Sequence, residues 1–371
     1  MILTRIFHPI GFGAFYTEKH IDPVSGQQIN VVYDCGTLSK LHYVKSAIKN
    51  YFTQGEDIDL LIISHFDTDH INGIPFLKDY CNIKKVIIPY IPKEDRILFV
   101  YSQKKLMKYA QLIIDTQKYF GPITEVISIK SIEEENSNDN PDQKTKIAEE
   151  KSEYSKPEKS LISGSQIKLP PLPGISSDWC FIPFNYNYSA QVAILKKIMV
   201  AKRLDYNQLS STKYINDNYD SIHKAYKELT DSNETSLVCF SGILGQANSA
   251  KCGKLDTHSN QYITSHMGLN CLYCGDANTL KSNFLVSLQN RLKGYYDTVQ
   301  TIQIPHHGSK GNFNINILQN PSKQISVISS ACNRVYNLPN ITVVNSIKSS
   351  GSTCINVTED PKSEFTEKGV Y

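Results

Sequence analysis

Two histidines and two aspartates lie close together in the segment His65-Phe66-Asp67-Thr68-Asp69-His70. The largely apolar run 58–63 comes directly before them, which is typical of a buried strand that ends in a loop. Neighbouring carboxylates repel one another unless a positive group lies between them. Imidazole and carboxylate both bind zinc, and carboxylates also suit manganese or iron. The pattern therefore favours a site for one or two divalent cations over a polar surface turn.

Two later segments place more groups of this kind at the ends of expected strands. Gly275-Asp276 follows the run 270–274, and Pro305-His306-His307-Gly308-Ser309 follows the run 298–304. Clusters of metal-ligand types at three strand ends are hard to obtain by chance. Asp34 ends a further expected strand, so it is a candidate neighbour of the site, with a turn or capping role as the alternative.

These motifs resemble those of the metallo-β-lactamase fold superfamily, and within it the hydrolase domain of ComEC-type competence proteins. The matching segments are Gly11-Phe12-Gly13-Ala14, where the family has Asp in place of Ala14; Val32 to Gly36; His65 to Gly73, where Asn72 replaces a usual Gly; and Pro305 to Ser309. The resemblance covers about residues 1–95 and 236–335. It implies an α/β fold, an αββα sandwich.

The resemblance also implies a role for each candidate residue. His65 and Asp67 would bind a first metal, Asp69 and His70 a second, and Asp276 would bridge the two. His307 directly precedes Gly308, as in the superfamily's final motif, so it is the expected late ligand. His306 would either support a metal ligand from behind or contact the substrate, and Asp69 and His306 are the expected catalytic residues. Asp34 would orient a ligand imidazole.

Two departures from the family pattern concern histidines. No separate third-motif histidine follows a Gly-rich strand end; His258 and His266 could serve, or could be ordinary loop residues. The family's downstream Tyr-Gly-His-Pro-like element is here Tyr336-Asn337-Leu338-Pro339, without the histidine. The ligands of the first metal are therefore less completely predicted than those of the second.

Two bound metal ions would activate a water for hydrolysis. Zinc is the expected metal, and manganese is the alternative. The expected activity is that of a metal-dependent phosphodiesterase or nuclease that acts on nucleic acid or a nucleotide. One alternative is hydrolysis of a small-molecule ester, thioester or lactone. The other is a metal-stabilised partner protein without enzymatic activity.

Composition sets limits on these functions. The chain has 371 residues, 40% hydrophobic and 20% charged, and its net charge of +3 is too small to indicate nucleic-acid binding by itself. Nine irregularly spaced cysteines argue against a disulfide framework, and Cys271-Leu272-Tyr273-Cys274 is expected to contribute buried thiols to a strand. With no signal-peptide pattern and no membrane-length apolar stretch, we expect a cytoplasmic protein.

The expected organisation is a core interrupted by an insertion. Residues 1–130 and 231–371 would form the two halves of the metallo-β-lactamase-like domain, and residues 131–230 a large, mostly helical insertion. The insertion begins with a polar segment, 131–160, that lacks the apolar surface needed for order, and two helices are expected within 189–230. It would serve as a lid, a substrate-binding cap or a surface for a protein partner.

Overall fold

The computed structural model describes most of the chain. The described residues are 1–132, 159–168, 179–186, 189–210, 212–228, 236–243, 252–256, 261–265, 268–333 and 335–371. Most of the predicted polar segment, and both His258 and His266, lie outside these ranges. Within them, every helix is too short or too polar to cross a membrane.

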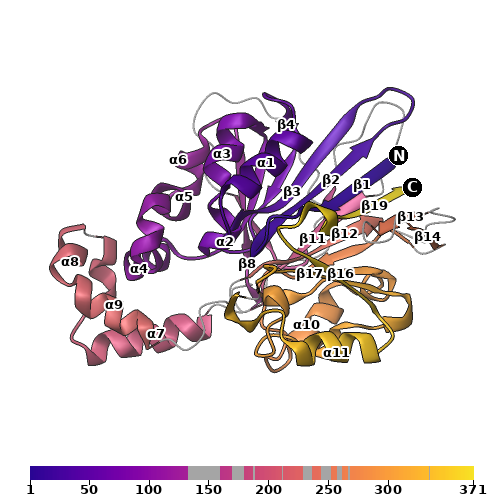
Figure 1. Ribbon diagram of the computed structural model, residues 1–371. Coiled ribbons are helices and arrows are strands. Elements are labelled where there is room, and N and C mark those ends of the chain that lie inside the picture. Colours follow the sequence, from indigo (N-terminus) through magenta and orange to yellow (C-terminus); the bar gives the residue numbers. More distant parts are fainter. Residues whose placement is uncertain are drawn as a thin grey trace.

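Two large β-sheets pack face to face (Figure 1). The first sheet has the order β14 (Gln261–Ser265), β13 (Cys252–Asp256), β19 (Phe365–Val370), β1 (Ile2–Phe7), β2 (Gly13–Ile21), β3 (Gln28–Thr37), β5 (Leu60–Ile62), β7 (Lys85–Pro89), β8 (Glu125–Lys130), β9 (Lys159–Ile162). The second has the order β10 (Ile167–Lys168), β11 (Trp179–Phe184), β12 (Val238–Ile243), β15 (Cys271–Tyr273), β16 (Thr301–Gln303), β17 (Ile325–Ser329), β18 (Thr353–Val357). Strands β4 (Asp57–Ile58) and β6 (Asn82–Ile83) form a separate parallel pair.

Helices cover the outer face of each sheet, which gives the four layers of the predicted αββα sandwich (Figure 1). Helices α1 (His42–Tyr51) and α3 (Ile74–Tyr80) pack on the first sheet, and α10 (Phe284–Arg291) and α11 (Ile341–Ser349) pack on the second. The prediction of a mixed α/β fold is confirmed.

Alternation along the strands produces this layering. In β3, Val31 and Tyr33 join the core between the two sheets, whereas Val32 packs toward the helices. In β5, which leads into the loop with the metal motif, Ile62 faces the second sheet and Leu61 faces the helices. Successive side chains of a strand point to opposite faces, so a strand covered on both faces is apolar throughout.

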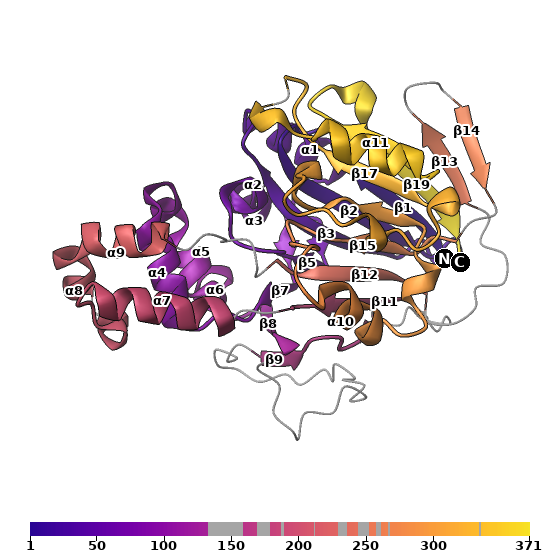
Figure 2. The same ribbon diagram turned by 90° about the horizontal axis from the view of Figure 1, so that it is seen from below.

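A helical lobe lies beside the sandwich (Figure 2). It joins α4 (Lys93–Ser102) to three helices from the predicted insertion, α7 (Ser189–Ala201), α8 (Thr212–Asp217) and α9 (Tyr219–Lys227), through a small apolar core. That core includes Leu98, Met199 and Ile222. The strands β9, β10 and β11, also from residues 131–230, belong instead to the two sheets. The domain boundaries themselves stay a prediction.

Several helices differ in extent from the sequence-based expectation. The helical pattern at 96–120 is divided into α4, the 3-10 helix η1 (Lys104–Tyr109), α5 (Ala110–Ile114) and α6 (Thr116–Phe120), with extended or irregular backbone at Gln103 and Asp115. Residues 189–230 hold three α-helices rather than two. The helix expected at about 279–292 begins only at Phe284, after the left-handed residue Asn283. The Cys271 and Cys274 thiols are buried and free, as expected.

The burial of His8 makes a prediction about acid stability. The ring is 3% exposed and stacks on Phe15, and burial lowers the pKa of His8 to about 3. In the unfolded chain His8 would therefore bind a proton below about pH 6.5, whereas in the folded chain it stays neutral. The free energy of unfolding should fall below that pH by about 1.4 kcal/mol per pH unit. Urea unfolding at pH 7.5 and 5.5 would measure this loss. His8→Gln should lose about 1.4 kcal/mol less between these values than the original chain; an equal loss would contradict the prediction.

Candidate metal centre

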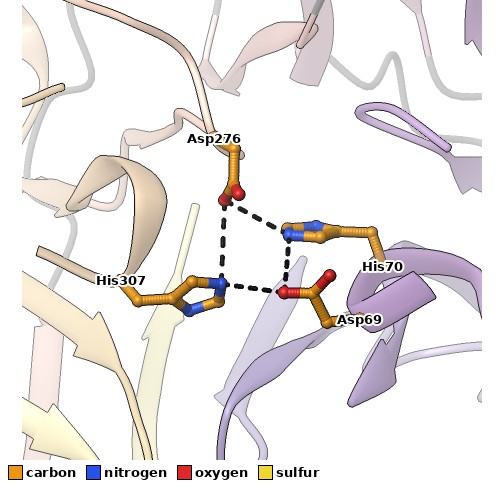
Figure 3. A group of neighbouring side chains, drawn as sticks. All are labelled: Asp69, His70, Asp276 and His307. Carbon is orange, nitrogen blue, oxygen red and sulfur yellow. Dashed lines mark hydrogen bonds and ion pairs between the residues drawn. The ribbon is translucent and has the colours of Figure 1, made fainter. Parts of the chain in front are cut away.

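Four buried side chains converge at the edge where the sheets bring their strand ends together (Figure 3). Asp69, His70, Asp276 and His307 each offer a ligand atom, and these atoms all lie within 4.8 Å of one another. Asp69 and His70 belong to the short helix α2 (Thr68–Ile71), just after β5. Asp276 follows β15, and His307 follows β16. Residues more than 200 positions apart thus form one cluster, as the three strand-end motifs predicted.

Asp276 lies between two sets of imidazoles. Its Oδ1 atom is 3.2 Å from Nε2 of His70 and 3.8 Å from Nε2 of His307. Its Oδ2 atom is 3.8 Å from Nε2 of His65 and 3.7 Å from Nε2 of His306. One carboxylate therefore presents a separate oxygen to each set.

The remaining two carboxylates divide between the same sets. Oδ2 of Asp69 is 3.2 Å from Nε2 of His307, on the Oδ1 side of Asp276. Oδ2 of Asp67 is 3.8 Å from Nε2 of His65, on the Oδ2 side. The other five predicted ligands, and His306 with them, thus surround Asp276.

Three of these polar atoms are buried without a hydrogen-bond partner: Nε2 of His65, Nε2 of His70 and Oδ1 of Asp276. Native structures rarely leave buried polar atoms unsatisfied, because the loss of solvation costs free energy. Nitrogen and carboxylate oxygen atoms that converge without protons between them are the usual donors to a divalent cation. The residues present therefore fit the divalent metals expected from the sequence.

Asp34 supports this centre from behind. The pairing of β2 with β3 shifts register near Ala14 and Tyr16, and Asp34 occupies the resulting irregularity with φ of +55°. A bulge of this kind turns a side chain away from its regular direction. Here the Asp34 carboxylate accepts hydrogen bonds from Nδ1 of His70 at 2.7 Å and from the backbone and hydroxyl of Ser64 at 2.7 and 2.6 Å.

These contacts fix the tautomers of the ligand histidines. A carboxylate only accepts, so His70 carries a proton on Nδ1, and its Nε2 atom faces Asp276. The Ser64 hydroxyl donates to Asp34 and so accepts from Nδ1 of His65, 2.9 Å away. Nδ1 of His307 donates to the backbone carbonyl of Ser329 at 2.9 Å. All three rings thus present Nε2 to the centre while Nδ1 is held by a hydrogen-bond partner, an arrangement typical of metal-binding histidines.

Replacement of Asp34 by asparagine should weaken metal binding about 10- to 100-fold, the range typical of partners that orient metal ligands. An amide offers a single acceptor oxygen where Asp34 receives three hydrogen bonds, so the His70 ring would lose its fixed orientation. Competition with a zinc-chelating dye would measure the affinity. Asp297→Asn, at an exposed position on η4 (Tyr296–Thr298), is the control. Equal affinities for the two variants would show that Asp34 has no such role.

Burial and close charges alter the acidity of the cluster. Burial, together with the carboxylates of Asp69 and Asp276, raises the pKa of Asp67 to about 7. Burial and the neighbouring His70 lower the pKa of His65 to about 4. Burial opposes ionisation of Asp276, but the surrounding imidazoles hold its pKa well below the ordinary range. Without a cation, the charge balance of the centre thus depends on protons shared among its own residues.

Glycines allow the close backbone approaches that the centre needs. A Cβ at Gly36 would lie 2.6 Å from the backbone of Asp69, and one at Gly13 would lie 2.9 Å from its carbonyl oxygen. A Cβ at Gly73 would meet the Cys35 sulfur at 2.7 Å. The β2–β3 hairpin can therefore press directly against the segment that carries Asp69 and His70.

Sequence reasoning missed the residues that hold the ligands in place. Ser64 links His65 to Asp34, and the hydroxyl of Ser236 accepts a hydrogen bond from the backbone of Asp276 at 2.9 Å. The side chain of Gln303 accepts from the backbone of both Cys274 and Gly275 at 2.7 Å. Only Ser64, adjacent to the metal motif, carried a positional signal.

Residues 24–143 match the family model for the metallo-β-lactamase superfamily. This matched stretch contains the segment from His65 to His70, so the similarity to the superfamily includes the principal metal motif. This superfamily comprises metal-dependent enzymes, hydrolases among them. No curated protein sequence matches the chain.

Three solved structures illustrate the range of structural relatives. A subclass B3 metallo-β-lactamase from a soil metagenome library, MEM-A1, is 10% identical, with 93% of this chain and 90% of that chain covered and a TM-score of 0.33. The E377D mutant of CmlA β-hydroxylase is 8% identical, with 98% and 53% covered and a TM-score of 0.40. Unliganded yeast PDE1 is 9% identical, with 100% of both chains covered and a TM-score of 0.38. The ComEC-type resemblance stays a prediction.

Proposed function

We propose that this protein is a hydrolase of phosphodiesters in nucleic acid or nucleotides that uses two divalent metal ions, with zinc the expected metal. The observation that carries the proposal is the position of Asp276, whose two oxygens face two separate sets of ligand atoms. His65 and Asp67 would share one ion with Asp276. Asp69, His70 and His307 would share the other.

Ions bound there would activate a water as the nucleophile and neutralise negative charge on the attacked phosphoryl group. The protein's own part is to hold six ligands in fixed directions. Asp34 and Ser64 set the orientation of His65 and His70, so little reorganisation is needed when substrate arrives. Oδ2 of Asp69 lies 3.2 Å from Nε2 of His307, so one ion bound between them would join residues 238 positions apart.

The open side of the centre suits an anionic substrate. His306 is the most exposed imidazole of the cluster, with 28% of its side chain accessible, and Asp67 is 21% accessible. The Lys105 ammonium is close enough to lower the pKa of Asp67, whose burial raises it. We propose that His306 contacts a non-bridging phosphate oxygen from this side. The motif resemblance to ComEC-type hydrolase domains supports the choice of a phosphodiester.

Hydrolysis of bis-p-nitrophenyl phosphate, single- and double-stranded DNA and RNA, each with added zinc or manganese, tests the proposal. We expect cleavage of at least one of these phosphodiesters, and its loss in Asp69→Ala and His70→Ala. Asp297→Ala, at an exposed position, is the matched control for an aspartate change. Metal-loaded protein that cleaves none of them but turns over a thioester, lactone or small ester would contradict the phosphodiesterase assignment and leave the metal centre intact.

A further inference from the structure

Residues with left-handed backbone gather around the metal centre. Among described residues other than glycine, seven have positive φ: Asp34, Arg203, Asn283, His306, His307, Tyr336 and Asn337. Asp34, His306 and His307 belong to the centre itself. Such conformations are uncommon for residues with a Cβ and are outliers for bulky ones, and they persist where the surroundings impose them. Tyr336, with φ of +62°, is the aromatic residue of this group that lies outside the set of candidate ligands.

The loop that carries Tyr336 is fastened to the His306-His307-Gly308 segment. The backbone N–H of Asn340 donates to the carbonyl of Gly308 at 3.0 Å. Pro339 lies so close that a Cβ at Gly308 would meet it at 2.9 Å. These two contacts hold the Tyr336 loop in place relative to the metal centre, so a movement of the loop would also displace His307.

An aromatic row leads from the centre to Tyr336. The Phe12 ring lies 4.1 Å from the His307 ring, centroid to centroid, and the Tyr336 ring lies 5.4 Å from Phe12. Phe12 is 6% exposed, whereas Tyr336 is 70% exposed. Phe12 thus forms a buried support, and Tyr336 lies beside it with most of its side chain in solvent.

The exposure of Tyr336 leaves its backbone strain unexplained by packing. A side chain that stays largely in water gains little from burial, so the fold obtains no comparable stabilisation in return for the left-handed conformation. Glycine would adopt this conformation without strain. The strained loop instead holds the flat face of the Tyr336 ring near the metal centre.

We propose that Tyr336, supported by Phe12, is the stacking wall for a nucleobase next to the scissile phosphodiester. This inference rests on the proposed phosphodiesterase function and names its substrate class: phosphodiesters that carry a base. Aromatic side chains stack on bases through their π faces, with little dependence on base identity. The wall would select for nucleotides or single-stranded nucleic acid, whose bases are free to stack on protein.

Steady-state kinetics on two chromogenic substrates test the stacking wall. Thymidine 5′-(p-nitrophenyl phosphate) carries a base, and methyl p-nitrophenyl phosphate has the same leaving group without one. Tyr336→Gly deletes the ring and relieves the strain, so the variant should fold at least as stably. We expect its KM for the thymidine substrate to rise about 5- to 100-fold with kcat little changed, and its kinetics on the methyl substrate to stay the same. Tyr336→Phe keeps the ring and should behave like the original chain.

The possible outcomes separate the two proposals. If Tyr336→Gly changes both substrates equally, or neither, the stacking wall is wrong while the hydrolase function stands. If Tyr336→Phe fails as Tyr336→Gly does, the contact belongs to the hydroxyl and stacking is overturned. If neither substrate is cleaved by the original chain, the hydrolase proposal fails. Calorimetric binding of thymidine 5′-monophosphate and of inorganic phosphate then decides: equal affinities for the nucleotide in the original chain and Tyr336→Gly would reject the wall.

Discussion

Asp276→Asn is expected to reduce hydrolysis by about 10³-fold or more and to lower the number of metals bound per chain. The carboxylate offers one oxygen to His70 and His307 and the other to His65 and His306. An amide keeps the size of the side chain but supplies one neutral oxygen in place of two charged ones. Metal ions that stabilise charge in the transition state are worth several kcal/mol, which corresponds to rate factors of this size.

Two measurements on Asp276→Asn distinguish a lost ligand from a lost fold. Metal content reports the ligand, and thermal unfolding followed by circular dichroism reports the fold. Asp297→Asn, exposed on η4, makes the same chemical change away from the cluster and should keep full metal content and activity. An Asp276→Asn protein that binds two metal ions and keeps its full turnover would show that Asp276 does not bridge the ions.

Arg5→Met is expected to have the largest effect on stability, a loss of about 3–5 kcal/mol of unfolding free energy. Arg5 on β1 is fully buried between the sheets and forms ion pairs with Glu18 on β2 at 2.8 Å and Glu367 on β19 at 2.7 Å. Burial alone would raise the pKa of Glu18, but Arg5 and His20 hold it at about 2. Methionine would leave two buried carboxylates without their cation.

Two variants test whether the buried charges cause this loss. Glu18→Gln with Glu367→Gln, added to Arg5→Met, should recover part of the stability because no uncompensated carboxylate remains. Lys84→Met removes a cation that is 52% exposed and paired with Asp59 at 2.9 Å, and should cost less than about 1 kcal/mol. Urea unfolding measures all three. A loss for Arg5→Met no greater than that for Lys84→Met would contradict the account.

The sequence predicted which side chains cluster at this edge because the candidate ligands follow strands. An apolar run that ends in ligand types is visible locally, and parallel strands carry such ends to one edge of a sheet. The segment from His65 to His70, Asp276 and the His306-His307 pair were identified this way, and the structure brings them together. Their distribution over two sets, with Asp276 between, was implied by the family resemblance rather than by any spacing.

The parts that sequence reasoning missed depend on contacts between distant residues. Arg5 and Glu367 are 362 positions apart, and each belongs to a strand whose alternation gives no sign of a buried ion pair. The pattern at 96–120 has helical periodicity throughout, yet the helix is interrupted at Gln103 and Asp115. Leu98 and Ile114, from separate helices, pack in the helical lobe. Tertiary packing overrides local propensity in such segments. Ser236 contacts the backbone of Asp276 and Ser329 contacts the His307 ring through hydrogen bonds that no periodic pattern encodes.

The most direct test of the central claim is to count the metal ions in protein purified without chelators, by inductively coupled plasma mass spectrometry. Asp276 and the five predicted ligands arranged in two sets around it predict close to two bound divalent metal ions per chain. They also predict that dialysis against zinc or manganese restores this number after chelation. A protein that holds no metal, and takes up none on dialysis, would contradict the assignment of this cluster as a metal centre and, with it, the proposed hydrolase.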